Sequence, residues 1–193
     1  MTDEDIRKIL EETQAIRHGH FELSSGLHSD TYVQCASILQ FPEHAESLGR
    51  ALAEKFKDLQ IGAVTSPAIG GILIGQEVAR ALGVRAIFSE RDASGRMTLR
   101  RNFQLESGER VLVIEDVWTT GGSTRETVAV IEEFRGIVVA AGAIIDRTGG
   151  ELELPVSTEA LLRMKVASYR PEECPQCRTG SIAIRPGSHF PRA

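Results

Sequence analysis

Two apolar runs without polar alternation constrain the fold of this chain more than any other feature. Val111–Ile114 and Ile137–Ile145 consist of aliphatic and small residues. Central strands of a parallel sheet have this composition, because helices cover both of their faces. A helical pattern from about Ser123 to Arg135 joins the two runs. Because such strand–helix–strand units form right-handed crossovers, the sequence predicts an α/β fold with an open parallel sheet flanked by helices.

The residues before these runs continue the alternation of strands and helices. A helix opens at Phe41-Pro42, Ala63–Ser66 predicts a buried strand, and a helix then runs through Leu82 to a second strand at Val84–Ser89. Further upstream, helical spacing extends from Ile6 to Ile16 and stops at His18–His20. The next segment, 21–34, predicts two short strands around a Ser-Ser-Gly turn. We divide the chain into an N-terminal part, 1–40, an α/β core, 41–150, and a C-terminal segment packed on the core, 151–193.

Composition excludes several classes of protein. The chain has 193 residues, which suits one domain. Its formal net charge of −5 and the lack of a basic block argue against nucleic acid as a partner. No stretch approaches the roughly 20 apolar residues of a membrane span, and the acidic start MTDEDIRKILEE does not resemble a signal peptide. We therefore expect a cytoplasmic protein without membrane partners.

The segment from Val111 to Val128 carries the chemistry. A buried strand delivers Glu115 and Asp116 to its carboxyl end, and a short Thr/Gly loop leads into a helix that Ser123 and Glu126 are expected to cap. A helix N-terminus binds phosphate. Carboxylates would repel phosphate, so they are expected to face ribose hydroxyls or a magnesium ion. The pattern predicts a ribose 5-phosphate site, and the alternative is a capped helix beside two solvated acids.

Several segments together resemble one enzyme family. Val111–Ser123 resembles the phosphoribosyl pyrophosphate (PRPP) signature of type I phosphoribosyltransferases. FELSSGLHSDTYVQC is similar to the N-terminal substrate hood of orotate phosphoribosyltransferases, and Ser66–Gly71 to their pyrophosphate-binding loop. SERDASGRMTLRRNF and the ending PEECPQCRTG…RPGSH are similar to the mobile catalytic loop and the tail of a bacterial subfamily. The resemblance covers nearly the whole chain.

This resemblance implies a type I phosphoribosyltransferase fold with a small N-terminal hood, working as a homodimer. It implies Mg²⁺-dependent transfer of ribose 5-phosphate from PRPP to orotate, a pentosyltransferase reaction of pyrimidine biosynthesis. Arg91 and Asp116 are implied as catalytic residues, and Thr119 and Arg147 as orotate contacts. The implied PRPP-binding residues are Glu115, Asp116, Val117, Trp118, Thr119, Thr120, Gly121, Gly122 and Ser123.

The chemistry of the arginines also indicates roles for them, independently of the resemblance. The guanidinium fork of Arg147 suits a planar carboxylate or imide edge, and the alternative is a salt bridge to Asp146 or another acid. The loop Glu90–Arg101 carries four arginines, which predicts a mobile basic loop that closes over pyrophosphate. The alternative is a solvated hairpin.

The chain departs from familiar members of the family in its lysines. It has no lysine in this loop, and Gly70 and Ser24 occupy positions where lysines are common.

A CxxC pair near the C-terminus, Cys174 and Cys177, resembles half of a zinc site. Tetrahedral zinc needs four ligands, and His189 and Cys35 are distant in the sequence. We interpret the pair as structural or free thiols and assign no metal ligand. The alternative is a half-site completed by a second subunit. Isolated histidines such as His20 and His28 are read as surface or hydrogen-bonded residues.

Two other functions share part of this pattern. A phosphoribosyltransferase for a purine or uracil would have the same PRPP loop, although purine enzymes often place an aromatic residue where this chain has Arg147-Thr148-Gly149. A regulator that senses PRPP and binds nucleic acid would need a basic face. Consumption of one base in the presence of PRPP distinguishes these functions.

Overall fold

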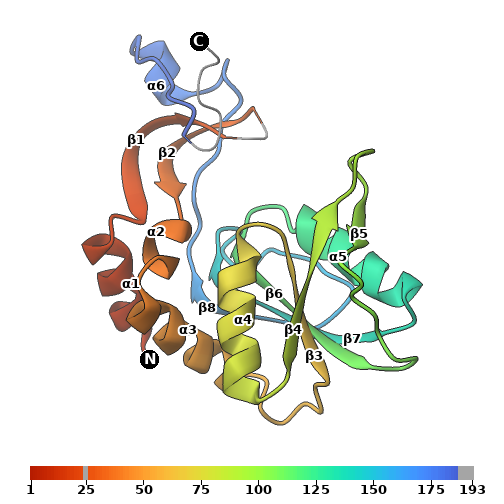
Figure 1. Cartoon of the computed structure of the whole chain (residues 1–193). Coiled ribbons are helices and arrows are strands. Elements are labelled where there is room, and N and C mark those ends of the chain that lie inside the picture. Colours follow the sequence, from red (N-terminus) through yellow and green to blue (C-terminus); the bar gives the residue numbers. More distant parts are fainter. Residues whose placement is uncertain (24–25, 187–193) are drawn as a thin grey trace.

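The computed structural model describes residues 1–23 and 26–186 (Figure 1). Ser24 and His189, singled out in the sequence, lie outside the described residues. The core is a six-stranded sheet in the order β5-β4-β3-β6-β7-β8, in which β5 is antiparallel and the other strands are parallel. This confirms the predicted α/β class. The strands are β3 (Ala63–Pro67), β4 (Arg85–Arg91), β5 (Met97–Leu99), β6 (Arg110–Trp118), β7 (Ile137–Asp146) and β8 (Thr158–Arg163).

Helices cover both faces of this sheet. Ile114 of β6 packs in one cluster with α3 (Pro42–Glu54) and α4 (Gly71–Leu82). The neighbouring Val113, which points to the opposite face, packs with Val128 of α5 (Gly122–Glu133). Burial on both faces explains why the β6 sequence shows no polar alternation.

A smaller unit, which we call the hood, stands beside the carboxyl ends of the core strands (Figure 1). Its antiparallel pair is β1 (Ile16–Glu22) and β2 (His28–Val33), preceded by α1 (Asp3–Glu12) and followed by α2 (Ala36–Leu39). The C-terminal segment, with α6 (Pro175–Arg178), runs back along this pair. Single bridges join His28 to Tyr169 and Phe21 to Ile184. The hood is therefore built from both ends of the chain.

Several boundaries differ from the expectation. Strand β1 begins at Ile16, so His18–His20 lie within a strand and do not merely end a helix. The short helix α2 and the edge strand β8 were not predicted. Helix α5 begins at Gly122 with Gly121 as N-cap and has no side-chain cap, so the predicted capping by Ser123 and Glu126 was wrong. Among residues 1–23 and 26–186, no helix is both long and apolar enough to cross a membrane.

Candidate active site

The acid pair lies at the carboxyl end of β6, at the edge of the sheet that the hood faces. Glu115 is buried and Asp116 is half-buried. Burial, followed by the neighbouring Asp116, raises the pKa of Glu115 well above its ordinary value. Burial likewise raises the pKa of Asp116. Within the described part of the chain neither carboxylate forms a salt bridge, so the pair is arranged to receive hydroxyl donors or a cation.

The loop after the pair leads into α5 and encloses a cavity of about 450 Å³. Gly121 adopts a left-handed conformation with φ of 71°, and a Cβ there would lie 2.7 Å from Leu152. The first amides of α5 have no side-chain cap, so they remain available to an anion, which the helix dipole favours. The exposed residues Thr119, Thr120, Gly122 and Ser123 surround these amides.

Trp118 has a supporting position in this loop. Its side chain is buried, and Nε1 donates a hydrogen bond of 2.9 Å to Oγ1 of Thr124 in the first turns of α5. Its backbone carbonyl accepts from the amide of Arg147. These bonds join the ends of β6 and β7 to α5 and hold the loop in place.

Arg147 contributes to a second cavity, of about 700 Å³, between the hood and the end of β6. Only 8% of the residue is exposed, and Nε has no hydrogen-bond partner. Nη2 of its guanidinium donates a long hydrogen bond of 3.5 Å to the carbonyl of Thr31, and burial lowers the pKa of Arg147. Asp146 instead accepts from the amides of Thr148 and Gly150. The alternative of a salt bridge to Asp146 was wrong.

The two cavities adjoin. Both include Val117, Thr119 and Thr120 in their walls, while Glu115 lines the smaller one and Asp116 the larger. The fold thus gathers every residue predicted for the site around one continuous region. Tyr32 and Lys165 also line the larger cavity. Sequence reasoning missed them, because they lie far from the motif at opposite ends of the chain.

The loop between β3 and α4 closes the site on the other side of the acid pair. A Cβ on Gly70 would lie 2.9 Å from each carboxylate oxygen of Asp116, and one on Gly71 would lie 3.0 Å from the carbonyl of Ile114. A side chain at position 70 would require the Asp116 carboxylate or the loop to move, and one at position 71 would be tightly packed. The Gly70 backbone thus lies directly against the Asp116 carboxylate.

The basic loop forms a hairpin between β4 and β5, with its arginines paired to acids. Arg91 lines the smaller cavity and contacts Glu126 of α5 at 2.6 Å. Arg96 pairs with Glu133, and Arg101 with Glu90. This geometry fits the hairpin alternative. Both side chains of the Arg91–Glu126 pair are about half exposed, and such pairs contribute only about 0–1 kcal/mol, so a ligand could displace the contact.

Comparison with known proteins agrees with this geometry. The family model of the phosphoribosyl transferase domain matches residues 34–158. A solved orotate phosphoribosyltransferase from Aeropyrum pernix has the same fold, with a TM-score of 0.70, 24% identity and coverage of 83% of this chain and 94% of that one. Fold and site together define a phosphoribosyltransferase.

Closer relatives narrow the class. The orotate phosphoribosyltransferase of Pelotomaculum thermopropionicum is 52% identical over 97% of this chain and 98% of its own length. That of Thermotoga maritima is 46% identical, over 95% of this chain and 97% of its own. The chain belongs to the orotate phosphoribosyltransferase family.

Proposed function

We propose that this protein transfers ribose 5-phosphate from PRPP to orotate and releases orotidine 5′-monophosphate and pyrophosphate. The observation that carries the proposal is Arg147, a buried guanidinium without an acidic partner in the described chain. It lines the larger cavity, next to the loop and first turn of α5 at residues 119–123, which we call the phosphate cradle. A buried cation without a counter-ion is costly. A planar carboxylate ligand supplies that counter-ion and matches the guanidinium fork.

Each part of the site has a task in this reaction. The amides of α5 and the hydroxyls around them hold the 5-phosphate, and Glu115 and Asp116 accept hydrogen bonds from the ribose hydroxyls. The bond from the anomeric carbon to pyrophosphate breaks as ring N1 of orotate, already deprotonated, bonds to that carbon. The chain contributes mainly by holding the two substrates in line, and Arg91 helps to neutralise the pyrophosphate that leaves.

Magnesium is part of this proposal. Mg²⁺ prefers oxygen ligands and binds through one or two carboxylates together with substrate phosphates and water. The two carboxylates beside the close-packed Gly70 loop fit that donor set, and Asp116 and Glu115 are the residues that would face the ion. The ion would neutralise charge that develops on the leaving pyrophosphate.

The proposal is tested by mixing the protein with PRPP and orotate, uracil, hypoxanthine or xanthine, each with and without Mg²⁺. We expect loss of orotate absorbance with Mg²⁺ present and no consumption of the other three bases. Consumption of another base would assign a different phosphoribosyltransferase. PRPP binding without turnover of any base would favour a sensor of PRPP.

The assembly and the compartment are also proposals. We propose a homodimer, since the resemblance implies a dimer in which the mobile loop reaches the neighbouring site. We also propose a cytoplasmic location, which suits the three free cysteines of the described chain.

A further inference from the structure

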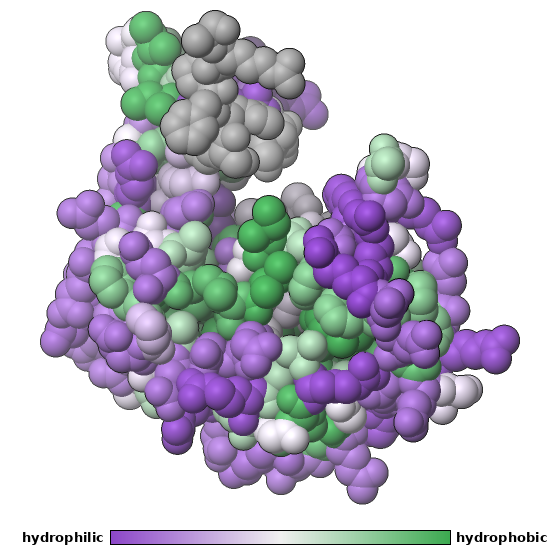
Figure 2. Space-filling model, viewed as in Figure 1, coloured by the Kyte–Doolittle hydropathy of each residue, from purple (hydrophilic) through white to green (hydrophobic). Residues whose placement is uncertain are grey.

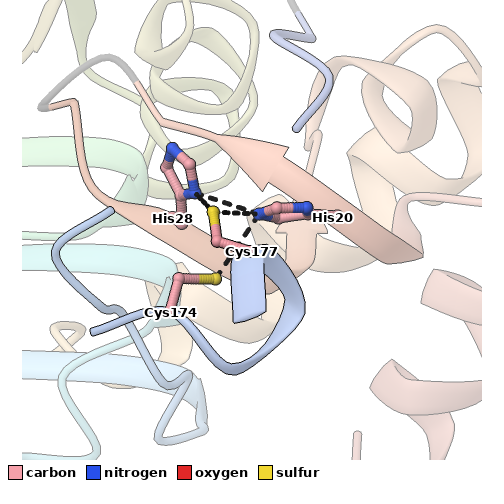
Figure 3. Close-up of side chains that lie close together, drawn as sticks. All are labelled: His20, His28, Cys174 and Cys177. Carbon is pink, nitrogen blue, oxygen red and sulfur yellow. Dashed lines mark hydrogen bonds between the residues drawn. The ribbon is translucent and has the colours of Figure 1, made fainter. Parts of the chain in front are cut away.

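Four side chains that the proposed reaction does not use converge at the outer end of the hood (Figure 3). They are His20 of β1, His28 of β2, and Cys174 and Cys177 at α6. One ligand atom from each lies within 4.8 Å of the other three. The sequence interpretation did not connect His20 and His28 with the two cysteines, because the histidines are about 150 positions away along the chain.

Four of the six distances among these atoms approach those of a tetrahedral zinc site. His20 Nε2 lies 2.9 Å from His28 Nδ1, 3.4 Å from Cys174 Sγ and 3.7 Å from Cys177 Sγ. Cys177 Sγ lies 3.2 Å from His28 Nδ1. Zinc bonded at about 2.0–2.3 Å to two nitrogens and two sulfurs separates its ligands by about 3.3–3.8 Å. These four distances therefore differ from those around a bound zinc ion by about half an ångström or less.

The donor set and its surroundings select the metal. Two sulfurs and two imidazole nitrogens in tetrahedral arrangement favour zinc, and two thiolates balance the charge of Zn²⁺. Three of the four residues are at most 9% exposed, and no coordination position remains for substrate, which is typical of structural sites. Nδ1 of His20 lies 3.2 Å from Ser181 Oγ, which orients the ring as partners of zinc-bound histidines do.

We propose that His20, His28, Cys174 and Cys177 bind one structural Zn²⁺ per chain, which fastens the C-terminal segment to the hood. Hydrogen bonds prepare this junction. The backbones of His28 and Tyr169 exchange two hydrogen bonds of 2.8 Å, and the side-chain amide of Gln176 donates to the carbonyl of Gly19. The fastened segment supplies Lys165, Val166 and Ser168 to the larger cavity. The ion would lie outside the cradle and act on the shape of the hood.

The direct test is metal analysis of untagged protein purified without chelators. We expect one zinc per chain, released when both cysteines are modified with a mercurial reagent. After removal of zinc, titration with Co²⁺ should produce the visible bands of a tetrahedral ion and a thiolate-to-metal charge-transfer band. None of these readouts depends on phosphoribosyl transfer, so their failure is distinct from failure of the proposed function.

Variants locate the ion. Cys177→Ser and His28→Gln should each lose most of the zinc and weaken the cobalt charge-transfer band. His18→Gln and Cys35→Ser are the matched controls, since neither residue belongs to the cluster, and both should keep one zinc per chain. Because a site variant could misfold, circular dichroism and the monodispersity of each protein are recorded alongside.

Three outcomes would overturn the proposal. Folded wild-type protein that contains no zinc and takes up neither Zn²⁺ nor Co²⁺ would refute the site. Zinc retained by well-folded Cys177→Ser would place the metal elsewhere. A disulfide between Cys174 and Cys177 that persists in protein prepared under reducing conditions would assign the pair to a covalent link.

Discussion

Arg147 is a buried cation for which the described chain supplies no acid, and its partner in our proposal is the substrate. Arg147→Ala should raise KM for orotate about 10- to 150-fold, because a charge-assisted hydrogen bond contributes about 1.5–3 kcal/mol. Arg147→Lys keeps the charge without the planar fork and should recover only part of the loss. Initial rates at varied orotate and fixed PRPP measure this.

The control for Arg147 is Arg163→Ala. The Arg163 side chain is 52% exposed at the end of β8, and its removal should leave both KM values within about twofold, as expected for a solvated charge. If Arg147→Ala instead raised KM for PRPP and left orotate unaffected, the assignment of the larger cavity to the base would be wrong.

Glu115 should lower the stability of the folded protein at neutral pH, although our proposal requires it for PRPP binding. Its pKa in the folded protein is raised from the ordinary value of 4.5, so the folded state holds a proton more tightly than the unfolded state. Stability contributed by this group is present below pH 4.5 and is lost as pH rises toward the raised pKa. Glu115→Gln should therefore raise Tm at neutral pH, by about 2–4 °C for each kcal/mol recovered, and weaken PRPP binding.

Calorimetry of Glu115→Gln and the parent at several pH values tests this sign. The gain in Tm should shrink as pH falls through 4.5, because below that pH the parent carboxyl is protonated in both states. A difference that stays constant across that range would mean that the carboxyl does not titrate as its burial requires. PRPP affinity, measured by isothermal titration, should fall in the variant at neutral pH.

The residues of the motif were predictable because they are consecutive in the chain. An apolar strand, two acids and a Thr/Gly loop can be read locally, and the structure arranges them in that order at the end of β6. Tyr32 and Lys165 could not be found in this way. No local pattern indicates that a tyrosine in one strand and a lysine far downstream line the same cavity. For the same reason, the proximity of His20 and His28 to the two cysteines was not predicted.

Among the elements, the β4–β5 hairpin presents one arginine to the cradle and another away from it. Arg91→Ala should lower kcat/KM for PRPP by about tenfold or more, because a positioned cation near the leaving group is lost. The control is Arg96→Ala, which removes the same charge from the same hairpin. In the parent protein Arg96 pairs with Glu133 and does not line the smaller cavity. The variant should stay within about twofold of the parent in steady-state assays.

The structure of the hood should affect KM for orotate more than KM for PRPP. If zinc fastens the C-terminal segment, Cys177→Ser should loosen the walls of the larger cavity that come from the hood and from Lys165–Ser168. We expect KM for orotate to rise about threefold or more, since looser positioning of a binding group weakens its contacts, while KM for PRPP stays near the parent value. An unchanged KM for orotate in a zinc-free variant would limit the metal to a stabilising role.

The order of core strands and helices was predictable, because strands that are buried on both faces have continuous apolar sequences. The start of β1 was not, since Ile16 fits both the helical spacing of α1 and a strand. Strand β8 was hidden in a segment with mixed composition. The capping of α5 failed because Gly121 occupies the cap position, and Glu126 instead pairs with Arg91.

For the whole molecule, we expect the mass of a dimer in solution, twice the 21.1 kDa of one chain. Multi-angle light scattering after size-exclusion chromatography measures this directly. A monomer with full activity would mean that one chain completes its own site, without a hairpin from a neighbour.

The two-ended construction of the hood has a consequence for synthesis of the protein. Strand β6, the loop after it and helix α5, which form the phosphate cradle, lie within residues 110–133 and leave the ribosome well before translation ends. Residues 165–184 must leave the ribosome before they can pair with residues 20–28. Since domains fold as their residues emerge, the nascent chain should acquire affinity for the sugar phosphate first and for the pyrimidine last.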